Sequence, residues 1–176
     1  MQPIVQEGDP VLRRKAKPVP KKDISSPALL RLLARMSKAL AATEHGVALA
    51  APQIGQPLRI FIVSKKVLER EYEAQGEGIP ETLSDLVFIN PDIVRLSRKK
   101  APMDEGCLSV KGLYGVVERH EKATVRALDR HGKPFTYHGS GLMAQIFQHE
   151  TDHLDGILFI DKARSFHKPE EAPEKV

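Results

Sequence analysis

The chain has no tryptophan and a single cysteine, Cys107, and the scarcity of cysteine excludes a class of protein. One cysteine cannot form an intramolecular disulfide, which excludes a small disulfide-stapled scaffold and favours a reducing compartment. No apolar run approaches the ~18 residues that a membrane span requires. Residues 1–20 also lack the apolar centre of a signal peptide. We therefore expect a cytoplasmic protein with no membrane partner.

Positively charged residues only slightly outnumber negatively charged ones. The net charge is +4, and the basic residues form short clusters only at 13–17 and 98–100. With three tyrosines, six phenylalanines and no recognisable nucleic-acid motif, the chain does not resemble a dedicated nucleic-acid-binding domain. A solvated basic surface is the simpler interpretation, and contact with a nearby polyanion such as ribosomal RNA is the alternative.

At 176 residues the chain is long enough for one domain with its own core, and we expect a single domain over 1–176. Charged residues and prolines follow Asp161, so a tail over 164–176 is expected to be flexible. The polar, glycine-containing segment 69–85 is expected to be an exposed loop.

Apolar spacing and turn residues predict an α+β fold of short, mostly antiparallel sheets packed around one late helix. Ser26 and Pro27 have the residue types of a helix start, and that helix is expected to stop near Gly46. The other predicted elements are strands over 58–63 and 86–90, a hairpin over 122–138, and a helix over 141–154.

The late helix contains His149-Glu150-Thr151-Asp152-His153, the metal-binding pattern His-Glu-x-x-His. Residues on a helix turn by roughly 100° each, so the two histidines lie one turn apart and can share a metal. Glu150 is offset from the line of the histidines, where a base acting on water would lie. Leu142 and Ile146 continue the same stripe, so this face is expected to point into the protein.

A catalytic zinc-type site usually has three protein ligands, and the third is not obvious downstream. Phe159 stands where one protease class carries a third histidine, and the downstream glutamates Glu170, Glu171 and Glu174 lie in the tail. Upstream, Cys107 in the stretch Glu105–Ser109 offers a soft thiolate, but for this cysteine taken by itself a buried structural role is the favoured interpretation. The pattern alone also allows two structural histidines, a zinc endopeptidase, or a non-catalytic module with a structural metal.

Three stretches taken together narrow these alternatives. They are Gly46–Gln53 (GVALAAPQ), Glu105–Ser109 (EGCLS) and Gln148–His153 (QHETDH). In this order they resemble the three signature motifs of the peptide deformylases, which remove the formyl group from the N-terminal methionine of new bacterial and organellar proteins. The resemblance extends over roughly residues 3–162. It implies N-formylmethionyl nascent peptides as substrates and, as a possible partner, the ribosome surface.

The resemblance also implies roles for individual residues. It makes Cys107 the third metal ligand beside His149 and His153, with Glu150 as the acid/base. It implies one divalent metal ion, usually Fe²⁺, which Zn²⁺ or another divalent ion can replace. The groups that bind the formyl oxygen match Gln53 and the backbone N–H of Leu108.

Small residues of the first motif are expected to meet the substrate. These substrate-contacting residues correspond to Gly46, Val47 and Ala48 in this chain. Val47 and Ile146 are expected to line a pocket for the methionine side chain. Ala48 departs from the family pattern, which usually has glycine there. The extra methyl group bears on substrate fit and leaves the chemistry unchanged.

Overall fold

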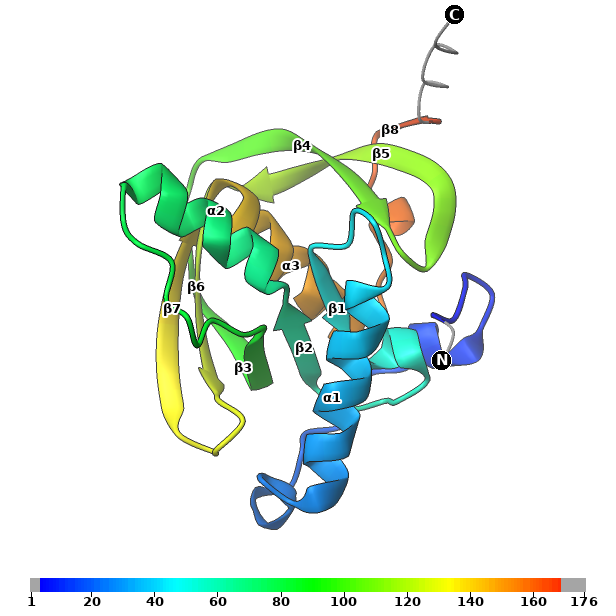
Figure 1. Cartoon of the computed structure of the whole chain (residues 1–176). Coiled ribbons are helices and arrows are strands. Elements are labelled where there is room, and N and C mark those ends of the chain that lie inside the picture. Colours follow the sequence, from blue (N-terminus) through cyan, green and yellow to red (C-terminus); the bar gives the residue numbers. More distant parts are fainter. Residues whose placement is uncertain (1–3, 169–176) are drawn as a thin grey trace, which may run out of the picture.

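The computed structural model describes residues 4–168 (Figure 1). The described part combines three α-helices with two antiparallel sheets, and the predicted α+β class is confirmed. The helices are α1 (Pro27–Ala41), α2 (Lys65–Gln75) and α3 (Gly141–Leu154). The strands are β1 (Ala48–Ala50), β2 (Ile60–Val63), β3 (Leu86–Leu96), β4 (Lys100–Cys107), β5 (Val110–His120), β6 (Lys122–Leu128), β7 (Pro134–Ser140) and β8 (Ser165–His167).

The larger sheet has the strand order β1-β2-β3-β6-β7, and α3 packs against it. Aromatic side chains fill the space between them. Phe61 on β2 stacks on Phe88 of β3 with ring centroids 4.5 Å apart, and Phe147 of α3 meets Phe88 edge-on at 5.2 Å. All three are fully buried, so α3 is held on the sheet by its apolar side.

The predicted hairpin is confirmed as β6 and β7. The two strands pair from Lys122↔Ser140 to Leu128↔Pro134. Asp129 accepts hydrogen bonds at the turn from the backbone N–H groups of His131 and Lys133, as expected for an aspartate in a turn.

The smaller sheet has the strand order β4-β5-β8, and none of its strands was predicted from the sequence. Strands β4 and β5 form a long hairpin that crosses the top of the molecule in Figure 1. Strand β8 lies within the tail 164–176, which was expected to be flexible. That expectation is wrong for Ser165–His167, because these residues pair with β5 from Val116 to Tyr114. Residues 169–176 of the predicted tail lie outside the described residues.

Helix α1 begins as predicted and ends early. The Ser26 hydroxyl accepts a hydrogen bond from the backbone N–H of Leu29, and Pro27 is the first helical residue. The helix ends at Ala41, five residues before Gly46. The Thr43 hydroxyl donates to the Leu40 carbonyl and satisfies one of the free groups at the helix end.

The prediction of a loop over 69–85 is wrong for its first part, because α2 runs to Gln75. Ser64 caps its start, and Gly76 ends it in the left-handed conformation at φ 71°. Only Val67 and Leu68 of its first turn are buried. The later turns are polar and exposed, which hides the helical period from a sequence reading. Residues 77–85 form no helix or strand.

Across residues 4–168, none of the helices combines the length and apolar character that crossing a membrane requires.

Candidate metal centre

Helix α3 presents the two histidines of the His-Glu-x-x-His pattern. Its bounds, Gly141–Leu154, match the predicted range. The rings of His149 and His153 lie with centroids 4.9 Å apart, as expected for residues one turn apart. His153 is 1% exposed, and burial lowers the pKa of its imidazole well below the usual value. A neutral imidazole is the form that binds a metal.

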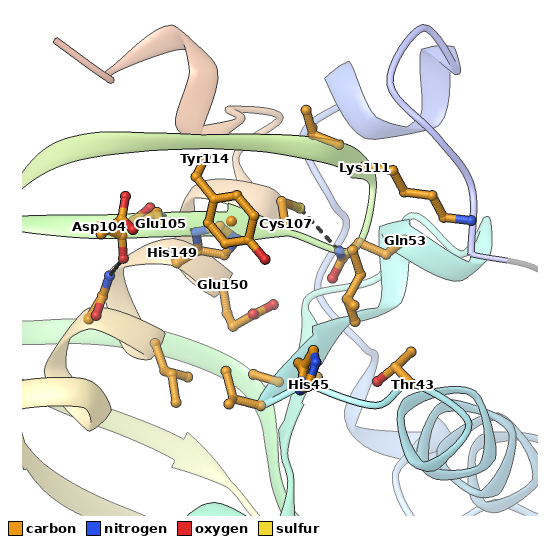
Figure 2. A pocket seen from close by; sticks show the side chains of 18 of the residues that line it. Thr43, His45, Gln53, Asp104, Glu105, Cys107, Lys111, Tyr114, His149 and Glu150 are labelled. Carbon is orange, nitrogen blue, oxygen red and sulfur yellow. Dashed lines mark hydrogen bonds and ion pairs between the residues drawn. The ribbon is translucent and has the colours of Figure 1, made fainter. Parts of the chain in front are cut away.

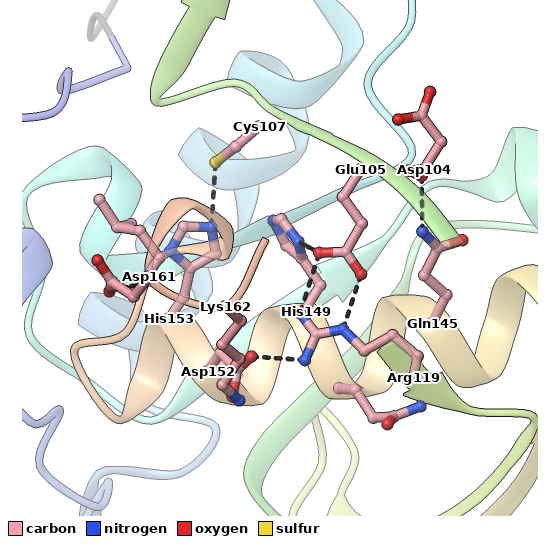
Figure 3. Close-up of polar contacts among 12 residues, drawn as sticks. Asp104, Glu105, Cys107, Arg119, Gln145, His149, Asp152, His153, Asp161 and Lys162 are labelled. Carbon is pink, nitrogen blue, oxygen red and sulfur yellow. Dashed lines mark hydrogen bonds and ion pairs between the residues drawn. The ribbon is translucent and has the colours of Figure 1, made fainter. Parts of the chain in front are cut away.

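Strand β4 brings Cys107 to the histidines. The register of β4 and β5 shifts between Gly106 and Cys107, at the end of the strand. The Cys107 Sγ lies 3.2 Å from His153 Nε2 (Figure 3). The donor atoms of Cys107, His149 and His153 all lie within 4.8 Å of one another. One sulfur and two imidazole nitrogens at this spacing fit a divalent transition metal with an open coordination position.

A buried carboxylate orients His149. Glu105 Oε2 accepts a hydrogen bond from His149 Nδ1 at 2.9 Å, which leaves Nε2 to face the cluster. Arg119 donates to both Glu105 oxygens, at 2.7 and 2.9 Å, and to Asp152 Oδ2 at 2.6 Å. Figure 3 shows this chain of contacts from β4 through β5 to α3. Lys162 adds a hydrogen bond to the other Asp152 oxygen at 2.6 Å.

The same network keeps Glu105 ionised. Burial alone would raise its pKa, but hydrogen bonds from Arg119 and His149 outweigh burial and lower the pKa to about 2. In the sequence, Glu105 stands out only as part of its motif, and Arg119 does not stand out at all. The available signal was strand alternation, because Glu105 lies two residues before Cys107 and so shares its face.

Glu150 lies beside the cluster without taking part in it. It is 4% exposed, and its Oε2 has no hydrogen-bond partner among the residues that the structure describes. Burial, with the nearby Glu105 charge, raises its pKa to about 7, although His149 acts in the opposite direction. A carboxyl group with this pKa can both accept and return a proton near neutral pH.

The side chain of Gln53 presents its amide nitrogen to the cluster of Cys107, His149 and His153. Its Oε1 accepts a hydrogen bond from the Ala50 backbone N–H at 2.8 Å, which fixes the orientation of the amide. Its Nε2 then lies 3.2 Å from Ser109 Oγ and 3.5 Å from Cys107 Sγ. The fully buried Ser109 was missed as a site residue, although it ends the quoted motif.

Gln53, Glu105, Cys107, His149 and Glu150 line one cavity of about 500 Å³ (Figure 2). Gly46, Val47 and Ala48 form part of one wall, and β4 with the start of β5 forms the opposite wall. Buried Ile146 contributes from α3, as expected. The expectation that Leu142 points into the protein is wrong: it lines the cavity but is 44% exposed, because α3 leaves the core at its first turn.

Comparison with known proteins gives a family for this arrangement. The family model of the polypeptide deformylases matches residues 1–169. A peptide deformylase of Desulforudis audaxviator is 42% identical over 168 residues, which cover 96% of this chain and 97% of that protein. The chloroplastic peptide deformylase 1A of Solanum lycopersicum is 41% identical over 165 residues. These cover 92% of this chain but 59% of the tomato protein.

Solved structures agree. A peptide deformylase from Legionella pneumophila superposes with a TM-score of 0.78 at 38% identity, covering 92% of this chain and 85% of that one. A class I type b peptide deformylase from Acinetobacter baumannii with Met-Ala-Ser bound has a TM-score of 0.78 at 31% identity. It covers 92% of this chain and 98% of that one. The metal-dependent peptide deformylases are therefore the family to which this chain belongs.

Proposed function

We propose that the chain hydrolyses the N-formyl group of formylmethionyl peptides and releases formate. One observation carries this proposal. The donor atoms of Cys107, His149 and His153 converge, and Cys107 and His149 line one cavity with a buried carboxylate, Glu150, and an oriented amide, Gln53. A hydrolase that acts on a carbonyl needs this combination of a metal position, a proton carrier and a hydrogen-bond donor for developing negative charge.

Cys107, His149 and His153 are the residues that would hold the metal. The fit rests on their three donor atoms, which lie within 4.8 Å of one another, and on the hydrogen bond that His149 donates to Glu105, which orients the His149 ring. A divalent ion at this position supplies Lewis-acid activation of water and of the formyl oxygen. We propose Fe²⁺ as the working ion, following the family resemblance, with Zn²⁺ able to take its place.

The chain's own groups then carry the proton and the charge. Glu150 accepts a proton from the attacking water while the water oxygen adds to the formyl carbon. The amide of Gln53 and the backbone N–H of Leu108 donate hydrogen bonds to the formyl oxygen as negative charge develops there. Glu150 returns the proton to the leaving amine, and formate departs.

The walls of the cavity supply selectivity. A formyl group carries only hydrogen on its carbonyl carbon, so a close approach of Gly46, Val47 and Ala48 admits it and excludes an internal peptide bond. Val47 and Ile146 are apolar members of the lining and suit the methionine side chain. Ala48 is 6% exposed, so its methyl group packs inside the wall with little room for a larger residue.

The competing functions have weaker support. A zinc endopeptidase with a third histidine would need that ligand at Phe159, which is 1% exposed and stacks on His149 with centroids 6.4 Å apart. A structural metal site needs four protein ligands, and among residues 4–168 the cluster has three.

We further propose that the substrates are nascent peptides and that the chain acts in the cytoplasm, near the ribosome surface. A reducing compartment keeps an unpaired thiol such as Cys107 free to bind a metal, which fits this location. The exposed basic turn at 98–100 and the net charge of +4 favour contact with a polyanion.

Formate release from formyl-Met-Ala-Ser tests the reaction. The chain is loaded without oxygen with Fe²⁺, or with Zn²⁺, and casein is offered in parallel. We expect formate from the tripeptide and no casein fragments. Casein cleavage without formate release would instead establish an endopeptidase, and neither product from metal-loaded protein would favour a structural metal.

A further inference from the structure

The outer face of the smaller sheet carries a row of cross-strand neighbours beside the cavity. Gly106 on β4 pairs with Tyr114 on β5, and Tyr114 pairs with His167 on β8. Side chains directly opposite each other on adjacent strands contact one another on the same face. Alternation places Asp104, two residues before Gly106, on this face as well. Glu105 and Cys107 point to the other face, toward α3.

Tyr114 reaches the cavity by crossing β4. A side-chain carbon built on Gly106 would lie 2.7 Å from Tyr114 Cε1, so only glycine leaves room for the ring at this position. Tyr114 lines the cavity together with Glu105, Cys107 and His149, and Figure 2 shows its ring projecting across the site. Its side chain is therefore part of the surface that a peptide in the cavity would meet.

The C-terminal strand holds this ring from the other side. The imidazole of His167 stacks on Tyr114 with centroids 5.6 Å apart and an interplanar angle of 22°. Its Nε2 lies 2.7 Å from Asp104 Oδ1, so His167 spans from β8 across β5 to β4. Tyr114 is consequently enclosed by Gly106 beneath it and by the His167–Asp104 contact beside it.

We propose that β8 is a positioning element, in which His167 holds Tyr114 as the wall that contacts the peptide beyond its formylated methionine. This inference rests on the proposed function and extends it to substrate length. The methionine end is served by Gly46, Val47 and Ile146 on the opposite side of the cavity. A ligand that ends at methionine does not reach the Tyr114 wall, whereas a tripeptide does.

The size of the effect follows from the contacts. An aromatic pair stabilises a geometry enough to change an equilibrium by about 2- to 10-fold. The side chains of His167 and Asp104 are 48% and 53% exposed, so their hydrogen bond adds at most a factor of about 5. The ring stack is therefore the larger contribution. Losing the His167–Tyr114 stack therefore raises KM for a tripeptide substrate. It leaves kcat unchanged, because Tyr114 does not contact the groups that transfer the proton.

Two probes and three variants of the full chain test this. The probes are formyl-Met-Ala-Ser and the shorter formyl-methionine amide, and equilibrium binding of unformylated Met-Ala-Ser is measured separately from formate release. His167→Ala removes the stack, His167→Phe keeps a ring but removes the hydrogen bond, and Ser165→Ala is the control on the same strand. Melting curves establish that each variant is folded.

For His167→Ala we expect KM for the tripeptide and Kd for Met-Ala-Ser to rise by about 3- to 10-fold, with kcat and the KM of formyl-methionine amide within about twofold of the wild-type values. His167→Phe should restore most of the tripeptide affinity, and Ser165→Ala should match the wild type.

Unchanged tripeptide binding in His167→Ala, or an equal loss with both probes, would overturn the proposal. If the wild-type chain releases formate from neither probe, the proposed reaction is wrong. The Met-Ala-Ser binding comparison then still decides whether His167 positions the wall.

Discussion

Replacing Glu105 by glutamine separates orientation of the metal ligand from the chemistry. The Glu105 carboxylate accepts three hydrogen bonds, two from Arg119 and one from His149. Glutamine keeps the shape but has a single carbonyl oxygen, and its NH₂ group faces an N–H of Arg119 or His149 in either orientation. At least one donor loses its acceptor, and the Arg119 charge retains only Asp152 as a direct acidic partner.

The cost is large because these groups are buried. The side chains of Glu105 and Arg119 are 2% and 4% exposed. Breaking a buried ion pair by changing one partner costs about 3–5 kcal/mol. For a chain of this length, each kcal/mol lowers Tm by about 2–4 °C, so a decrease of about 6–20 °C is expected. Loss of the acceptor for a ligating histidine weakens metal binding by about 10- to 100-fold.

The assay compares Glu105→Gln with Glu118→Gln, which removes the exposed ion pair to Arg164 on the same sheet. An exposed pair contributes about 0–1 kcal/mol, so the control should melt close to the wild type. Tm is measured for the metal-free proteins, and metal affinity by competition with a chelator. If the two variants share the same Tm and metal affinity, the reasoning about the buried network is wrong.

Four further outcomes are expected. Cys107→Ala should lose most bound metal on purification, and a full equivalent held at wild-type affinity would remove Cys107 from the ligand set. Glu150→Gln should retain metal and reduce formate release by about 10²–10⁴-fold, measured on one preparation; full metal with normal turnover would exclude Glu150 as the acid/base. Leu68→Ala should lower the free energy of unfolding by about 2–5 kcal/mol in denaturant titrations, because Leu68 anchors α2 in the core. Shortening the exposed segment 77–82 should leave kcat/KM for formyl-Met-Ala-Ser unchanged, and a loss in a folded variant would show that the segment shapes the site.

Local patterns in the sequence determined the parts of the site that lie on one element. The spacing of His149 and His153 is a property of any helix, so the helical period alone places the two imidazoles together. The turn residues from Asp129 to Gly132 likewise specify the β6–β7 hairpin, since a short turn sets its own register. The family resemblance added Cys107 as the third ligand, a position that spacing alone left open.

Only the tertiary structure decided which distant residues meet. The contact between Arg119 and Glu105 depends on the register of β4 with β5, and their contact with α3 depends on packing between layers. Both contacts join residues that are far apart in the sequence, so no local sequence pattern predicts either of them. The same reason applies to β8, whose exposed residues lie among the charged residues and prolines that predicted a tail. Its three residues become a strand because β5 offers a free edge, and that pairing brings His167 against Tyr114.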